Sequence, residues 1–512
     1  MNRGRMSATP GGPAVGAVAA PGRRRTRRGV LGGAVLSAAA AAAVGACQTA
    51  GGSGAGAPRS PAPADGTAPA GARQPARLEV WLPGRQADAD ALEPFHRQFV
   101  AETPGVGAVA VQLVSNEAMM EQVTAALAGG VPPDVARLKE YRLADLGARG
   151  ALLPLDRLVV KDPRVRLSDF TPQSVDGSRA PAGGAGGRRS AGEPLPLLGL
   201  PDSHQLVVLF WNTDLVARAG LDPRRAPESW EALRRAALAA TSPSAAAGGP
   251  SGGEAGASGD APSSLRRWGF QFYEFSTREQ AYSWFMEWIW RAGGDVWPGE
   301  GRARATLDTA AGLRALQFQV DLLHADRSAV PAETPVAELI SGVAQGRIAY
   351  WMTTANAALT YERTAPGLRF GVGPLPPDRR DAHQLQHNAL SVFAASRAAD
   401  AAYGLVGFRS REDIQARWAA DGAWLPVRPS LWSRPPFSQD ERWRAIGALV
   451  HRPGNRPKPT VPEWDAFTAV ILPPLLAAWR GETSPRAALI AAEQAADANL
   501  SARRAAAANP GR

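Results

Sequence analysis

Residues 206–211 read Leu-Val-Val-Leu-Phe-Trp, an uninterrupted apolar run of the length of one β-strand. A strand that alternates apolar and polar residues covers a core with one face, whereas a continuous apolar run is typical of a strand buried on both faces. Such strands belong to sheets that carry helices on each side. The run therefore favours an α/β fold.

Strand and helix patterns alternate around this run. Residues 78–82 (Leu-Glu-Val-Trp-Leu) are predicted to form a short strand, and residues 92–99 repeat large apolar side chains at helical spacing. Ser229 stands directly before a helix-prone segment, residues 230–233, and is predicted to be its N-cap. This alternation agrees with an α/β sheet.

The first 46 residues have the features of an export signal. Residues 26–31 (Thr-Arg-Arg-Gly-Val-Leu) resemble a twin-arginine signal, residues 29–44 are apolar and uncharged, and residues 44–47 (Val-Gly-Ala-Cys) resemble a bacterial lipobox. We predict that residues 1–46 are removed and that Cys47, the only cysteine, is lipidated and holds the protein outside the cytoplasm at a membrane surface. The alternative is a transmembrane anchor, but the apolar stretch is shorter than the ~20 residues that span a bilayer.

Three segments have compositions that disfavour a folded core. Residues 47–76 are rich in Gly, Ala, Pro and Ser and are predicted to be a disordered linker. Gly-rich stretches near 176–191 and 241–264 are predicted to be disordered insertions.

The net charge of +10 would ordinarily suggest a nucleic-acid partner. Residues 1–46 hold seven arginines and no acid, however, so the chain after the signal carries +3. That is an ordinary surface charge, and we expect no nucleic-acid partner. With Cys47 lipidated, no thiol is left for a disulfide, a metal site or a nucleophile.

The sequence gives no sign of a catalytic centre. His383 and His387 are four residues apart, but the Glu of a His-Glu-x-x-His motif is missing. No phosphate-binding Gly-x4-Gly-Lys-Ser/Thr loop occurs. We expect no enzyme activity, no metal and no cofactor.

Several segments together resemble the extracellular solute-binding proteins of bacterial ABC importers, in particular the sugar-binding group that includes maltose-binding protein. The segments that carry the resemblance are, in chain order, 78–81 (Leu-Glu-Val-Trp), 133–135 (Pro-Asp-Val), 146–156 (Leu-Gly-Ala-Arg-Gly-Ala-Leu-Leu-Pro-Leu-Asp), 209–215 (Leu-Phe-Trp-Asn-Thr-Asp-Leu), 219–223, 227–233, 293–294, 345–350, 373–376 and 422–428. The resemblance spans residues 78 to 500.

The resemblance implies a two-lobed periplasmic-binding-protein-like fold, with a hinge and a ligand cleft between the lobes. Lobe one is expected to hold residues 77–203 and 388–420, and lobe two residues 206–386 and 424–512. It also implies a monomer that binds a sugar or oligosaccharide and delivers it to the membrane-spanning permease of an ABC transporter.

Aromatic side chains are candidates for the cleft because a flat ring covers the apolar face of a sugar at little entropic cost. Trp351 follows a predicted strand, residues 348–350, and in α/β sheets ligands lie beyond the carboxyl ends of strands. Trp424 stands in the turn near the last expected crossing between lobes. Both are predicted to bind ligand.

Polar candidates follow from the resemblance as well. His387 and Asn388 stand at the second expected crossing, where both lobes can contact a ligand. The remaining candidates lie in loops that follow predicted strands or crossings: Arg85, Glu140, Tyr141, Tyr273, Glu274 and Arg428.

Two alternatives stay open at this point. The same fold could bind another cargo, such as a polyamine, a peptide or glycerol phosphate. A polyamine cleft should show several carboxylates, and Glu140 and Glu274 are the only ones among the candidates. A surface glycan hydrolase would need two carboxyl groups ~5–9.5 Å apart, a spacing that sequence does not reveal.

Overall fold

A computed structural model of the 512-residue chain supplies the structure. It describes residues 75–84, 86–116, 118–181, 194–242, 266–272, 278–297, 305–422, 424–459, 461 and 464–508. The predicted signal, Cys47 and nearly all of the predicted linker lie outside these residues. Most of the two predicted insertions also lie outside them, although residues 176–177 end a helix and Arg179 forms a bridge with Leu197.

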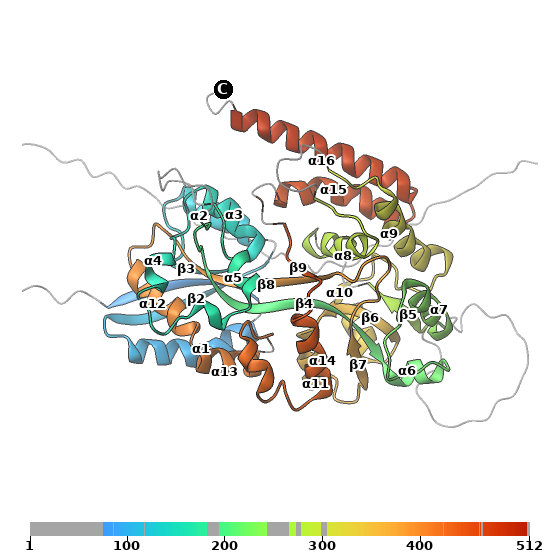
Figure 1. The fold of residues 1–512 in the computed structure, drawn as a ribbon, viewed down its shortest axis with the longest axis horizontal. Coiled ribbons are helices and arrows are strands. Elements are labelled where there is room, and N and C mark those ends of the chain that lie inside the picture. The colour runs from blue at the N-terminus through green and yellow to red at the C-terminus, as the bar shows by residue number, and fades with distance from the viewer. Residues whose placement is uncertain are drawn as a thin grey trace, which may run out of the picture. The chain divides into compact units, whose positions relative to one another are not determined.

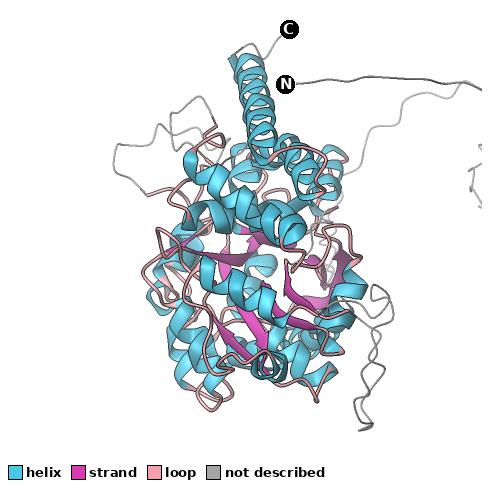
Figure 2. Ribbon diagram, turned by 90° about the vertical axis from the view of Figure 1, so that its right-hand side faces the viewer, coloured by secondary structure: helices cyan, strands magenta, loops and turns pink. Residues whose placement is uncertain are grey.

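The described residues form a nine-stranded sheet with helices on both of its faces (Figures 1 and 2). The strands are β1 Ala76–Pro83, β2 Val106–Val114, β3 Val135–Lys139, β4 Leu200–Asn212, β5 Trp268–Gln271, β6 Ile348–Thr354, β7 Phe370–Gly373, β8 His383–Val392 and β9 Asn455–Arg456. The α-helices are α1 Gln86–Glu102, α2 Met119–Ala128, α3 Leu143–Ala148, α4 Asp156–Val159, α5 Pro172–Gly177, α6 Thr213–Arg218, α7 Trp230–Ala240, α8 Arg278–Arg291, α9 Ala310–Val320, α10 Val336–Ala344, α11 Ala357–Thr364, α12 Ala399–Arg409, α13 Glu412–Gly422, α14 Glu441–Val450, α15 Trp464–Trp479 and α16 Pro485–Ala508. Short helical turns are η1 Glu140–Arg142, η2 Leu167–Asp169, η4 Asp321–Ala325 and η5 Pro429–Ser433.

The strand order is β2-β1-β3-β8-β4-β6-β5, with β7 beside β4 and β9 beside β8. Pairs β1–β2, β1–β3 and β5–β6 are parallel, whereas β3–β8, β4–β8 and β4–β6 are antiparallel. The two long strands, β4 and β8, therefore join one group of parallel strands to another (Figure 1). We call β1–β3 with α1–α5, α12 and α13 lobe one, and β5–β7 with α6–α11 and α14–α16 lobe two.

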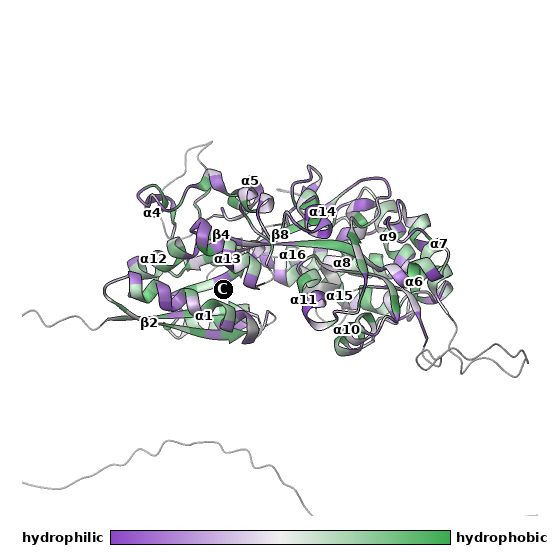
Figure 3. Cartoon of the chain, turned by 90° about the horizontal axis from the view of Figure 1, so that it is seen from below, coloured by the Kyte–Doolittle hydropathy of each residue, from purple (hydrophilic) through white to green (hydrophobic). Residues whose placement is uncertain are grey.

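The apolar run at 206–211 behaves as the sequence predicts. Leu206, Val208 and Phe210 face one core of lobe two, and the intervening residues face another. Both faces of β4 are thus buried, which is why this segment lacks alternation. Figure 3 shows the green ribbon of β4 running between the lobes.

Each lobe has its own apolar cores. In lobe one, the helices α1, α12 and α13 pack on one face of the sheet, and α2 and α3 pack on the other. In lobe two, α7–α9, α15 and α16 cover one face, while α10, α11 and α14 cover the other. The predicted helix cap is confirmed, since the Ser229 hydroxyl accepts the Ala232 N–H at 3.1 Å. No helix in the described part of the chain is both long and apolar enough to cross a bilayer.

Candidate functional site: a cleft between the lobes

A cavity of about 380 Å³ opens where the lobes meet across β4 and β8. Cavities of this size commonly hold small ligands. Lobe one contributes Pro83, Gly84, Asp88, Asn116, Arg137, Lys139 and Trp424. The crossing strands contribute Gln205, Val207, Gln384, Gln386 and Asn388. Lobe two contributes Ser283, Trp284, Val336, Ile340, Thr353, Thr354, Asn356, Ala357, Thr360 and Tyr361. The walls therefore come from both lobes.

The floor of this cleft is made of side-chain amides. Gln384, Gln386 and Asn388 alternate along β8, so all three project from the same face of the strand. Gln205 of β4 is paired directly with Gln386, which extends the amide surface onto the second crossing strand. Each carboxamide can donate and accept hydrogen bonds without carrying a charge.

A buried cluster of one carboxylate and two guanidinium groups stabilises the wall from lobe one. The Asp202 carboxylate accepts a hydrogen bond from Arg137 at 2.7 Å and from Arg409 at 2.8 Å, and all three side chains are at most 3% exposed. The Arg137 guanidinium lies 3.9 Å from the centre of the Trp424 ring, and Trp418 stacks beside that ring at 6.1 Å. Arg137 thus fixes the one aromatic ring that lobe one places against the cleft in the described part of the chain.

The wall from lobe two presents hydroxyl and amide groups. Thr353 and Thr354 end β6, and Asn356 follows them before α11. The hydroxyl of Tyr361 accepts a hydrogen bond from the Trp351 indole at 3.1 Å, which orients the phenol ring beneath the cleft. This wall therefore combines neutral polar groups with apolar side chains, among them Trp284, Val336 and Ile340.

On the opposite face of β8 the two histidines, His383 and His387, make their contacts within the protein, whereas the buried Ser391 hydroxyl has no hydrogen-bond partner among the described residues. The Nε2 atom of His387 lies 2.9 Å from the Ser178 hydroxyl, and the His387 N–H donates to Glu140 at 3.2 Å. Burial, and then the neighbouring His204, lower the pKa of His387 to about 3. Burial raises the pKa of Glu140 to about 7, against the attraction of Lys458.

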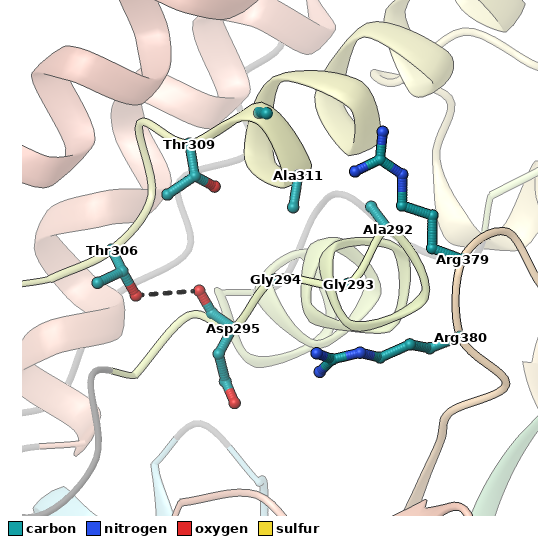
Figure 4. A pocket seen from close by; sticks show the side chains of 10 residues that line it. Ala292, Gly293, Gly294, Asp295, Thr306, Thr309, Ala311, Arg379 and Arg380 are labelled. Atoms are coloured by element: carbon teal, nitrogen blue, oxygen red, sulfur yellow. Dashed lines mark hydrogen bonds between the residues drawn. The ribbon is translucent and has the colours of Figure 1, made fainter.

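A second cavity, of about 480 Å³, lies within lobe two alone (Figure 4). Gly293, Gly294 and the first turn of α9 line it, and Arg379 and Arg380 project beside it. The Asp295 carboxylate is engaged by Arg456 at 2.6 Å. Because this cavity has walls from one lobe, movement of the lobes would not open or close it.

The sequence of the chain matches the family model for bacterial extracellular solute-binding proteins over residues 84–416. The chain belongs to this family.

Solved structures give the same fold. The chain is similar to a solute-binding protein of an ABC transporter from Thermotoga lettingae solved with α-D-tagatose, with a TM-score of 0.68 and 20% identity over 83% of this chain and 99% of that one. It is similar to the GacH receptor of Streptomyces glaucescens, solved with acarbose, with a TM-score of 0.66, 22% identity and coverage of 83% and 98%. It is also similar to the sugar-binding protein MalE of Xanthomonas citri, with a TM-score of 0.66 and 21% identity over 85% of this chain and 100% of that one. This solute-binding protein therefore has the two-lobed α/β fold that the sequence predicts.

The structure places two of the predicted site residues of this solute-binding protein in the cleft lining. Asn388 lies on the floor, and its amide also donates to Ser203 at 3.2 Å. Trp424 lies on the wall from lobe one. Four other candidates, Arg85, Tyr273, Glu274 and the lipidation site Cys47, lie outside the described residues.

The remaining candidates are buried away from the cavity. Trp351 is fully buried and stacks on Phe210, with ring centres 5.7 Å apart. The His387 side chain lies on the opposite face of β8, and the Glu140 carboxylate accepts the backbone N–H of His387. Tyr141 packs against Trp464 and Lys458. Arg428 pairs with Asp169 at 3.0 Å and lies over Phe170.

The sequence reasoning missed the amide floor. The segment 383–388 reads His-Gln-Leu-Gln-His-Asn, and the amides stand at every second position. That alternation is the signal that could have identified them, because alternate residues of a strand share a face. The same alternation places the side chains of His387 and Asn388 on opposite faces of the strand, although the prediction grouped them together.

In the part of the chain that the structure describes, no three His, Cys, Asp or Glu side chains are grouped in a way that could hold a metal ion.

Proposed function

We propose that this solute-binding protein is the receptor of an ABC importer for a sugar or oligosaccharide. The cleft carries the proposal, because its walls come from both lobes and combine amide and hydroxyl side chains with two tryptophans, Trp284 and Trp424. A sugar offers hydroxyl groups at its rim and apolar faces on its ring, which such a lining matches. The neighbours solved with tagatose and acarbose bind ligands of this kind.

Binding would proceed by closure of the lobes around the ligand. Ligand that contacts both walls favours the closed form over the open form, because only the closed form makes both sets of contacts. In the proposed arrangement Trp424 covers a sugar face and Asn388 bonds a hydroxyl. In this proposal the lobes hold residues 77–203 with 388–420 and 206–386 with 424–512, except that Trp424 and Val427 pack against the core of lobe one. The ligand leaves chemically unchanged.

The proposed setting is the outer surface of the cell membrane. Twin-arginine export followed by lipidation of Cys47 would anchor a monomer near the permease that takes the sugar. Replacing Cys47 by Ser should release the protein from the membrane fraction into the medium or periplasm. A Cys47→Ser protein that is exported and still sediments with membranes would contradict the lipid anchor.

Isothermal calorimetry tests the ligand class. The panel holds D-glucose, D-galactose, maltose and maltotriose. Spermidine, a tripeptide and glycerol 3-phosphate represent the alternative classes of cargo. We expect saturable binding to at least one saccharide, and about tenfold weaker binding by Trp424→Ala, ~1.4 kcal/mol, because the aromatic platform is lost. Binding of spermidine, the peptide or glycerol 3-phosphate without any saccharide would assign another cargo. Slow conversion of maltotriose into shorter products would point instead to a hydrolase.

A further inference from the structure

Resting on the proposed function, we propose that Gln384 and Gln386 bind the ligand directly and make the cleft selective for neutral, hydroxyl-bearing ligands over charged ones. The proposal concerns the floor of the cleft, where these two side chains lie next to each other on one face of β8. Successive residues on one face of a strand are ~6.5–7 Å apart. Two neighbouring groups of one small ligand can therefore reach both amides.

Both side chains are buried, and each has at least one amide atom without a hydrogen-bond partner among the described residues. Gln384 is 0% exposed, and neither its Oε1 nor its Nε2 atom has a hydrogen-bond partner among the described residues. Gln386 is 7% exposed, and its Oε1 atom is also without a partner there. Buried polar groups in proteins nearly always have partners, and leaving one without a partner destabilises the fold. A ligand in the cleft would supply the missing bonds.

Most of the unpaired atoms in the described lining are oxygens. Within the part of the lining that the structure describes, the buried atoms without a hydrogen-bond partner include Oδ1 of Asn116 and of Asn356 as well as the two glutamine oxygens. The buried donors of the lining that lack a hydrogen-bond partner include Nε2 of Gln384 and Nε1 of Trp424. Acceptors therefore outnumber donors. A hydroxyl can donate to such oxygens, whereas a carboxylate or phosphate can only accept.

The charge of the described lining disfavours a cationic ligand. Asp88 is the one carboxylate that the described lining contains, and Arg137 and Lys139 are its cations. The Asp202 carboxylate behind the wall is shared by Arg137 and Arg409. A buried ammonium ligand needs carboxylates to offset the loss of its hydration, and this wall offers more positive than negative charge. A polyamine or amino sugar is thus disfavoured by the positive charge of the lining, whereas an anion is disfavoured by its unpaired acceptor oxygens.

The experiment compares Gln384→Leu and Gln386→Leu with Gln415→Leu. Gln415 is a matched control because it is also buried, at 3% exposure, and its Oε1 atom also lacks a hydrogen-bond partner among the described residues, but its amide nitrogen donates to the Pro201 carbonyl at 3.2 Å and it does not line the cleft. Calorimetry uses glucose, galactose, maltose and maltotriose, with glucuronate and glucosamine as the charged counterparts of glucose. Urea unfolding is measured on each variant without ligand.

We expect the two cleft variants to bind the saccharide at least tenfold more weakly while their unfolding midpoint is unchanged or higher. Gln415→Leu should show the opposite pattern, a lower midpoint and unchanged affinity. Wild-type protein should bind the neutral sugar at least tenfold more tightly than either charged counterpart.

If the wild type binds a saccharide and the cleft variants bind it equally well, this inference fails while the proposed function stands. The inference also fails if both cleft variants lower the unfolding midpoint as Gln415→Leu does, because the amides would then be structural. Equal or tighter binding of a charged counterpart by wild type overturns the selectivity. If no saccharide binds the wild type, the proposed function fails and the inference falls with it.

Discussion

The two faces of β8 are both buried and both polar, yet they differ in where their hydrogen bonds go. On the face opposite the cleft, the two ring nitrogens of His383 lie 2.9 Å from Arg291 and from Asp381, and His387 contacts Ser178. On the cleft face, the side-chain amide of Gln384 has no hydrogen-bond partner among the described residues. In our proposal the same strand therefore serves as structure on one side and as a binding surface on the other.

This difference gives a criterion for separating structural from functional polar residues. A buried polar side chain that is fully bonded stabilises one conformation, and removing its partner leaves an uncompensated group. A buried polar side chain without partners beside a cavity costs stability in the free protein and contributes in the complex. The following predictions test whether the two faces of β8 obey this rule.

The largest effect is expected from Arg291→Met on the structural face. The change removes the partner of Glu287, and both side chains are 0% exposed. Burial already raises the pKa of Glu287, with Arg291 opposing that rise. Loss of one partner of a buried ion pair destabilises by about 3–5 kcal/mol, which urea unfolding at pH 7 measures. A double change, Glu287→Gln with Arg291→Met, should recover part of the loss; a single variant as stable as wild type would contradict the assignment.

A smaller effect should follow from His387→Gln as the pH is lowered. The unfolded chain protonates this histidine near 6.5, whereas the folded chain holds its pKa at about 3. Between these values the unfolded state binds more protons, so wild-type stability falls as the pH falls, by up to about 1.4 kcal/mol per pH unit for this group. The variant should lack this contribution.

Urea unfolding at pH 7, 6, 5 and 4 measures how the free energy of unfolding changes with pH in the wild type and in the His387→Gln variant. Glu140 acts in the reverse direction, because a folded pKa of about 7 stabilises the protein below 4.5 and this contribution is lost as the pH rises through 7. It is common to both proteins and cancels in the difference. Parallel slopes for wild type and variant would show that His387 is already free to take up a proton.

The smallest effect is expected from Ser178→Ala. This change removes the hydroxyl that lies 2.9 Å from His387 and should cost about 1 kcal/mol of stability. Because Ser178 and His387 lie on the structural face, calorimetry should find sugar affinity within twofold of wild type. A loss of sugar affinity comparable to that of Gln386→Leu would indicate that His387 takes part in ligand binding.

The sequence predicted the fold better than the site. The run at 206–211 revealed a strand buried on both faces, and Ser229 revealed a helix start, because both signals are local. Trp351 stands at the end of a predicted strand, as a binding residue should, but its ring is fully buried. Which face of β6 holds Trp351 depends on pairing with β4, where it lies opposite Phe210. That register is set by residues some 140 positions away, which no local pattern reveals.

The path of β8 has a consequence for how the polypeptide is made. Lobe one cannot complete its sheet without residues 387–392, which leave the ribosome after about three quarters of the chain has been synthesised. Until then β3 and the first part of β4 expose unpaired edges, which are prone to association with other chains. A nascent lobe one is therefore the species that chaperones would have to shield, and a translocation route for finished proteins would have to reject it until β8 is inserted.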